Sequence, residues 1–110
     1  MTHDTSPCVA ILAVPGCQLL DVTGPFELFA SATAPGSPGR AYRVVLVAPE
    51  GLRVTTEAGL VLEAHETLAS LDPARIDTLI VAGGPGSRYF RQPINSEWTA
   101  TTSCTTTSGR

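Results

Sequence analysis

Asp21 is the residue of this 110-residue chain whose setting most favours chemistry. It stands between two apolar residues, Leu20 and Val22, in a stretch with few other polar side chains. A carboxyl group in such a place is either partly buried or turned to water beside the start of a helix. The residues alone favour the structural alternative, so Asp21 enters as a candidate acid whose partners decide its role.

A second candidate is the turn Gly83-Gly84-Pro85-Gly86, which directly follows an apolar run. Adjacent glycines let backbone N–H groups approach an anion or a developing oxyanion closely. Neither the dinucleotide pattern G-x-G-x-x-G nor the phosphate-loop pattern ending in Gly-Lys-Ser/Thr is present. A tight turn at the end of a strand is therefore the simpler interpretation of these glycines.

The cysteines and histidines give weaker indications of a functional site. The three cysteines, Cys8, Cys17 and Cys104, are odd in number and far apart, which favours reduced thiols over a disulfide framework. Cys17 follows Pro-Gly, and a helix N-terminus there would lower its thiol pKa, although a small buried core residue is the commoner case. With His3 and His65 the cysteines show no paired ligand spacing, so we expect neither a metal nor a cofactor.

Three apolar runs must position these groups: residues 8–14, 42–48 and 77–82. Each is unbroken rather than alternating, which indicates a strand buried on both faces, as in a parallel sheet. Between the first two, apolar residues recur at helical spacing over residues 18–33. Gly24-Pro25 interrupts this stripe and predicts either a kink or a restart after Thr23, which is a good N-cap residue.

The intervening segments predict smaller elements. Residues 53–56 and 60–64 resemble two short strands joined through Glu57-Ala58-Gly59, which gives an antiparallel ribbon, and residues 66–71 predict one helical turn. The order strand, helix, strand, ribbon, strand is the opening of a doubly wound α/β sheet. The sequence thus predicts an incomplete, flavodoxin-like parallel sheet with a small antiparallel ribbon.

The charge and hydropathy of the sequence argue against nucleic-acid-binding, membrane-spanning and secreted proteins. The formal net charge is −3, and the seven arginines are scattered with no lysine among them, so this segment is not expected to bind nucleic acid directly. No apolar run approaches the roughly 18 residues of a membrane span, and the first seven residues lack the basic region of a signal peptide. We expect a cytoplasmic protein with no membrane contact.

Taken together, residues 9–29 resemble the start of the ThiJ/PfpI superfamily, which has the class I glutamine amidotransferase-like fold. The motif Leu-Asp-Val-Thr-Gly-Pro-Phe-Glu-Leu-Phe at 20–29 is typical of isonitrile hydratase and of AraC-type regulators with a PfpI-like amino-terminal domain. The segments 42–51, 55–60 and 77–86 agree in order. The resemblance covers about residues 8–91 and implies that Asp21 is the acid of the site. It also implies that Gly83 and Gly84 supply backbone donors and that Thr23 contributes to ligand binding.

The sequence departs from this family after the glycine turn. Family members continue to a nucleophile elbow that usually reads Val-Cys-Thr-Gly, whereas here a Thr-rich tail follows. Cys104 comes too early and lacks the small Gly that the elbow uses, so the nucleophile is not assigned to it. We therefore expect residues 8–91 to be the amino-terminal part of a PfpI-like domain. Residues 92–110 are expected to be disordered or non-family sequence that follows a truncation or a shifted frame. We also expect the strands of such a chain to keep an uncovered face.

Two functions follow from the resemblance. The first is a partial ligand-sensing or dimerisation domain of an AraC-type transcriptional regulator, without its DNA-binding part, which binds an unidentified small molecule and forms a homodimer when complete. The alternative is a fragment of an isonitrile hydratase-like enzyme, in which a Cys thiolate attacks the isonitrile carbon and Asp21 orients water or relays a proton. Thr23 slightly favours the hydratase, because regulators often carry Ala there. A nonfunctional remnant of either remains a third interpretation.

Overall fold

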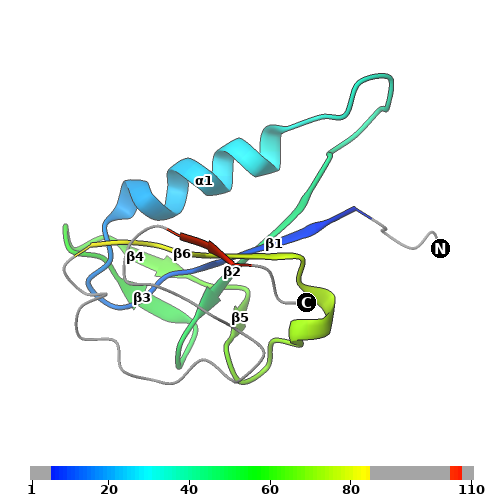
Figure 1. Cartoon of the computed structure of the whole chain (residues 1–110). Coiled ribbons are helices and arrows are strands. Elements are labelled where there is room, and N and C mark those ends of the chain that lie inside the picture. The colour runs from blue at the N-terminus through cyan, green and yellow to red at the C-terminus, as the bar shows by residue number, and fades with distance from the viewer. Residues whose placement is uncertain (1–5, 85–104, 108–110) are drawn as a thin grey trace.

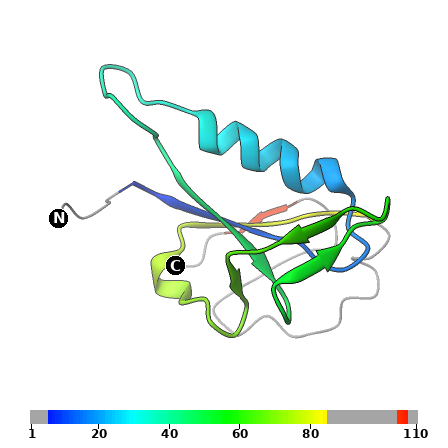
Figure 2. The same cartoon turned by 180° about the vertical axis from the view of Figure 1, so that it is seen from behind.

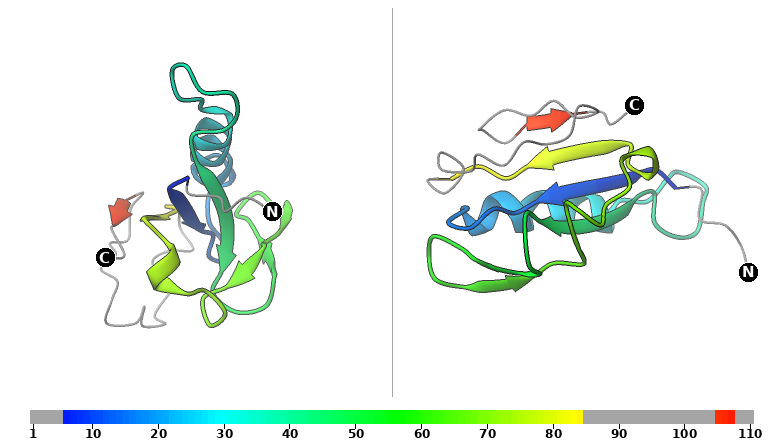
Figure 3. Two further views of the ribbon diagram at one scale, coloured as in Figure 1. Left: turned by 90° about the vertical axis from the view of Figure 1, so that its right-hand side faces the viewer. Right: turned by 90° about the horizontal axis from the view of Figure 1, so that it is seen from below.

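A central, mainly parallel sheet organises the computed structural model, which describes residues 6–84 and 105–107 (Figure 1). The strands lie in the order β5 (Glu66–Thr67), β2 (Arg43–Ala48), β1 (Cys8–Leu12), β6 (Thr78–Val81) and β7 (Thr105–Thr107). The first four are mutually parallel, and β1 lies between β2 and β6, as the right-hand view of Figure 3 shows. The predicted parallel sheet is confirmed.

The central strand β1 is buried along its whole length, with no residue more than 2% exposed. In β6, the residues from Leu79 to Val81 are buried as well. This is the burial that unbroken apolar runs predict, because a strand covered on both faces has no solvent side to carry polar residues. The expectation of an uncovered face is therefore wrong for these two strands.

Helix α1 (Leu19–Ser31) lies across one face of the sheet (Figure 1). It buries Val22 and packs Phe29 edge-on against Tyr42, with 5.1 Å between the ring centroids. The helix runs unbroken through Gly24 and Pro25, so of the two predicted outcomes the restart after Thr23 is wrong. The N-cap residue is Gln18, which makes no side-chain capping hydrogen bond.

The smaller elements lie on the other side of the sheet from α1 (Figure 2). Strands β3 (Arg53–Thr55) and β4 (Val61–Glu63) form the predicted antiparallel ribbon. The helical turn predicted at 66–71 is wrong in its first residues, which form β5 and pair with the end of β2. A turn follows, closed by hydrogen bonds to the Thr67 carbonyl, and then the 3-10 helix η1 (Pro73–Arg75).

The Thr-rich tail contributes three residues to the sheet. Strand β7 pairs antiparallel with β6, with Thr106 opposite Ile80. The rest of the tail, and the predicted boundary between residues 91 and 92, lie outside the described residues. Within the described part of the chain, no helix is long and apolar enough to cross a membrane.

Candidate functional site

The candidate site lies where β1 and β6 end and the chain turns into α1. Several backbone hydrogen bonds hold the loop between β1 and α1. Among them, Ala13 N–H donates to the Val47 carbonyl (2.9 Å), and Cys17 N–H donates to the Val14 carbonyl (3.0 Å). Gly16 takes a φ of 80°, a left-handed conformation that suits glycine. In parallel α/β sheets, ligands bind outside this carboxyl edge of the strands.

The loop that follows β6 packs directly against the start of α1. The Gln18 N–H donates to the Gly83 carbonyl at 3.0 Å, which joins the two loops across the edge of the sheet. Gly84 has a φ of 130°, and a Cβ atom built there would lie 2.6 Å from the Gln18 nitrogen. Position 84 thus requires glycine on two counts, conformation and close approach. The predicted donor role of the Gly83 and Gly84 N–H groups stays a prediction. The hydrogen bond described here uses the Gly83 carbonyl, which is an acceptor.

Asp21 sits in the first turn of α1 and is half-buried. Its backbone N–H donates to the carbonyl of Gln18, the residue that binds Gly83, at 3.0 Å. Four residues on, Pro25 has no N–H, so the Asp21 carbonyl lacks its usual partner within the helix. The structure therefore brings Asp21 to the same edge as the glycine turn, as the resemblance implies, and its role there stays a prediction.

Thr23 lies inside α1 and does not cap it. Its hydroxyl donates to the Leu19 carbonyl at 3.1 Å, a bond to the preceding turn that is common for threonine in helices. The prediction that Thr23 is an N-cap is wrong because the helix starts four residues earlier. The side chain is half-buried, and its hydroxyl oxygen keeps lone pairs with which to accept a bond from a ligand.

Cys17 is the thiol next to the candidate acid, and it is fully buried. Burial raises its pKa above the ordinary value of 9.0, hydrogen bonding at its own backbone opposes that, and the Asp21 carboxylate raises it further. The alternative of a reactive Cys17 activated by a helix N-terminus is therefore wrong, and Cys17 is a protonated core residue. Cys104 lies outside the described residues.

The β3–β4 ribbon forms a wall of this edge, a role that the motif at 55–60 did not reveal. The Gly16 N–H donates to the Thr55 carbonyl, and the Glu57 N–H donates to the Cys17 carbonyl, both at 2.8 Å. Thr56 is buried and closes the ribbon's turn through a 2.9 Å bond from its hydroxyl to the Leu60 carbonyl. Within residues 6–84, no three histidine, cysteine or carboxylate side chains cluster as metal ligands would.

No family model matches the chain. A curated protein from Streptomyces lividans, the uncharacterized protein in the cpoL 5' region, is 38% identical over 82 residues. The match takes in 72% of this chain and 55% of that protein, so the chain spans about half the length of its relative.

Solved structures give the fold. A DJ-1 superfamily protein from Agrobacterium tumefaciens has a TM-score of 0.59 at 21% identity, over 79% of this chain and 43% of that one. An AraC family transcriptional regulator from Pseudomonas putida has a TM-score of 0.53 at 22% identity, over 81% of this chain and 51% of that one. The chain therefore has the α/β fold of the DJ-1/ThiJ/PfpI superfamily, in agreement with the resemblance carried by its motifs.

Proposed function

We propose that this chain is part of a PfpI-like domain that senses a small ligand or mediates dimerisation in an AraC-type transcriptional regulator. The observation that carries the proposal is the set of polar groups at the Asp21 edge, where the neighbouring thiol, Cys17, is buried. The thiol beside Asp21 is buried and its pKa is raised, so it is not the thiolate that covalent chemistry needs. A half-buried carboxylate, a threonine oxygen and two glycine backbones form a set of groups that orients a bound molecule.

The similarity to an AraC family regulator supports the same assignment at the level of the fold. The DNA-binding role belongs to another part of such a protein, in keeping with the net charge of −3 and scattered arginines of this chain. Ligand binding at the Asp21 edge, or pairing of two copies through α1, would then change the activity of the DNA-binding part.

The genomic sequence downstream of the Arg110 codon, translated in all three frames, tests this proposal. A nucleophile elbow followed by paired helix-turn-helix segments is the expected result. A stop codon soon after a complete PfpI-like domain would overturn the regulator and leave an enzyme.

The second candidate, an isonitrile hydratase-like enzyme, is favoured by one feature, Thr23 in the motif at 20–29. Turnover of a simple alkyl isonitrile by residues 1–110 would establish the second candidate, whereas its absence is expected of both, because the nucleophile elbow is assigned to neither. We expect no turnover above the uncatalysed rate. Turnover that is lost in Cys17→Ala would reverse our assignment of Cys17 and establish the enzyme.

A further inference from the structure

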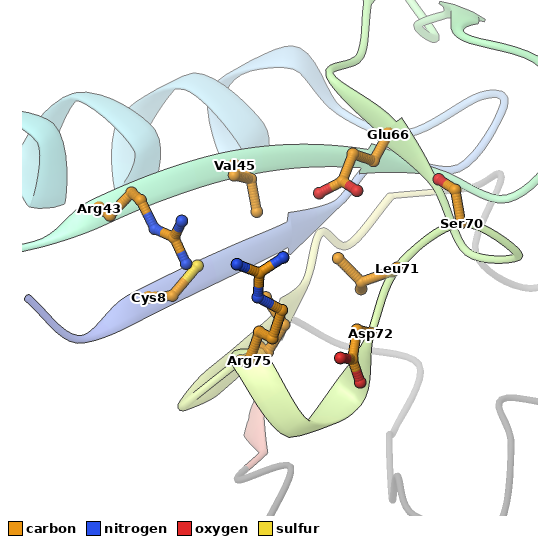
Figure 4. Close-up of a pocket in the computed structure, with 9 residues that line it drawn as sticks. Cys8, Arg43, Val45, Glu66, Ser70, Leu71, Asp72 and Arg75 are labelled. Carbon is orange, nitrogen blue, oxygen red and sulfur yellow. The ribbon is translucent and has the colours of Figure 1, made fainter. Parts of the chain in front are cut away.

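A cavity of about 90 Å³ opens beside the start of β1 and β2, away from the carboxyl edge where Asp21 lies (Figure 4). It lies at the amino ends of β1 and β2, where Cys8 and Arg43 are paired in register. The segment that runs from β5 through η1 closes it. Its lining residues are Cys8, Arg43, Val45, Glu66, Ser70, Leu71, Asp72, Arg75 and Ile76.

Three charged groups point into this cavity. Figure 4 shows the guanidinium groups of Arg43 and Arg75 and the carboxylate of Glu66 directed toward its centre. Among residues 6–84 the one ion pair within 4.0 Å joins Arg53 to Glu63, on the ribbon. Among the described residues, neither cavity arginine therefore has a carboxylate within that distance, and both guanidinium groups keep N–H donors for a ligand.

The floor of the cavity is formed by buried side chains. Cys8, Leu71 and Ile76 are all at least 92% buried. Burial raises the pKa of the Cys8 thiol, and the Arg43 guanidinium, hydrogen-bonded to the sulfur, acts in the opposite direction.

The remaining polar side chains are already engaged. Asp72 accepts the Ala74 N–H at 3.1 Å and so caps η1. The Ser70 hydroxyl donates to the Thr67 carbonyl at 3.1 Å. The groups that point into the cavity are the two fork-shaped donors of Arg43 and Arg75 and one acceptor, the Glu66 carboxylate, while Asp72 keeps its second oxygen beside η1.

We propose that this cavity binds a small oxyanion that carries its own hydrogen-bond donor, namely hydrogen phosphate. Arg43 and Arg75 donate to the anion's oxygens, and Glu66 accepts the P–OH proton in a hydrogen bond. An anion without a donor, such as sulfate, would set a lone pair against the Glu66 carboxylate. The site is separate from the Asp21 edge and does not depend on the function proposed above.

Titration calorimetry of residues 1–110 with inorganic phosphate and with sulfate, in a phosphate-free buffer near neutral pH, tests the proposal. We expect phosphate to bind about tenfold more tightly than sulfate, the effect of one charge-assisted hydrogen bond. Arg43→Gln and Arg75→Gln should each weaken phosphate binding about tenfold or more. Arg53→Gln, which removes an arginine of the ribbon, is the matched control and should leave binding unchanged.

The variant Glu66→Gln tests the phosphate preference most directly, because the amide can donate to sulfate as well as accept from phosphate. The preference for phosphate over sulfate should fall toward unity in this variant. Equal affinity for the two anions in the unaltered chain would overturn the proposal. So would an equal loss in Arg53→Gln, or no saturable phosphate binding up to about 50 mM.

Discussion

The backbone conformation at position 84 and its close approach to the Gln18 nitrogen together favour glycine there. Gly84 combines a φ of 130° with a built Cβ position 2.6 Å from the Gln18 nitrogen. Gly84→Ala should therefore lower the free energy of unfolding by about 2 kcal/mol or more, through strain and a forced shift of the α1 start. Urea unfolding measures this. Gly51→Ala, at a glycine with open space around it, should cost far less; an equal cost in both variants would contradict the argument.

The buried thiol of Cys17 makes stability depend on alkaline pH. Its pKa in the folded state lies above the ordinary 9.0, so the folded state holds this proton more tightly than the unfolded state. The contribution of Cys17 is complete below pH 9 and is lost as the pH rises from 9 toward the raised value. Urea titrations from pH 7 to 11 should show this fall, with a shallower slope in Cys17→Ala. An unchanged slope would contradict the prediction.

At the scale of the element, α1 contains a proline that weakens it. Pro25 leaves the Asp21 carbonyl without its helical donor and crowds it with the pyrrolidine ring. Pro25→Ala should raise the free energy of unfolding by about 2 kcal/mol, the helix gain less the entropy that proline removes from the unfolded chain. Urea unfolding checks the sign, and a loss of stability would contradict the argument, since it would mean that the entropy proline removes from the unfolded chain outweighs the helix gain.

His65 ties the end of the ribbon to β2. Its ring nitrogen Nδ1 accepts the Leu46 N–H at 2.9 Å, and its backbone N–H donates to the Leu46 carbonyl at 2.8 Å. The imidazole ring also stacks on Phe26. His65→Leu should leave the Leu46 N–H unsatisfied and cost about 1–2 kcal/mol. Hydrogen exchange at the Leu46 amide should accelerate. The Ala13 amide, bonded to the Val47 carbonyl, is the internal control and should keep its protection.

How much of this the sequence predicts depends on the length of the pattern. The three apolar runs are long enough to identify β1, β2 and β6, and the turn at 57–59 identifies the ribbon. β5 has two residues and η1 has three, too few for any periodicity, and both depend on contacts with distant strands. Helix α1 passes through Gly24-Pro25 because burial of Val22 and Phe29 against the sheet outweighs the local cost of proline, a tertiary effect that no local pattern carries.

The same limit applies to the site. The resemblance leads to Asp21 and the glycine turn, but the link from Gln18 to Gly83 joins residues 65 positions apart and is visible only in the fold. The burial that makes Cys17 inert likewise comes from the ribbon and from the loop after β6.

At the scale of the whole molecule, α1 presents two exposed leucines. Leu20 and Leu28 are 75% and 71% exposed, one on each side of Gly24 along the helix. If the domain pairs with a second copy, as the proposed function includes, these side chains are the apolar surface of α1 available to it. Analytical ultracentrifugation should then show dimers that the double variant Leu20→Glu, Leu28→Glu converts to monomers. Leu52→Glu, Leu60→Glu on the ribbon is the control, and a chain that stays monomeric at all concentrations would remove dimerisation from the proposal.

The placement of β1 between β2 and β6 has a consequence for the order of folding. The β1, α1 and β2 unit is local and is complete once residue 48 has been made. The other edge of β1 pairs only when β6 has been made. The contact that begins this side joins residues 69 positions apart: the Cys8 N–H donates to the Asp77 carboxylate at 2.8 Å. Contacts of such sequence separation form late and slow the folding rate. During synthesis the most apolar strand of the protein therefore has one open edge until β6 emerges, and that interval is when the nascent chain most needs a chaperone.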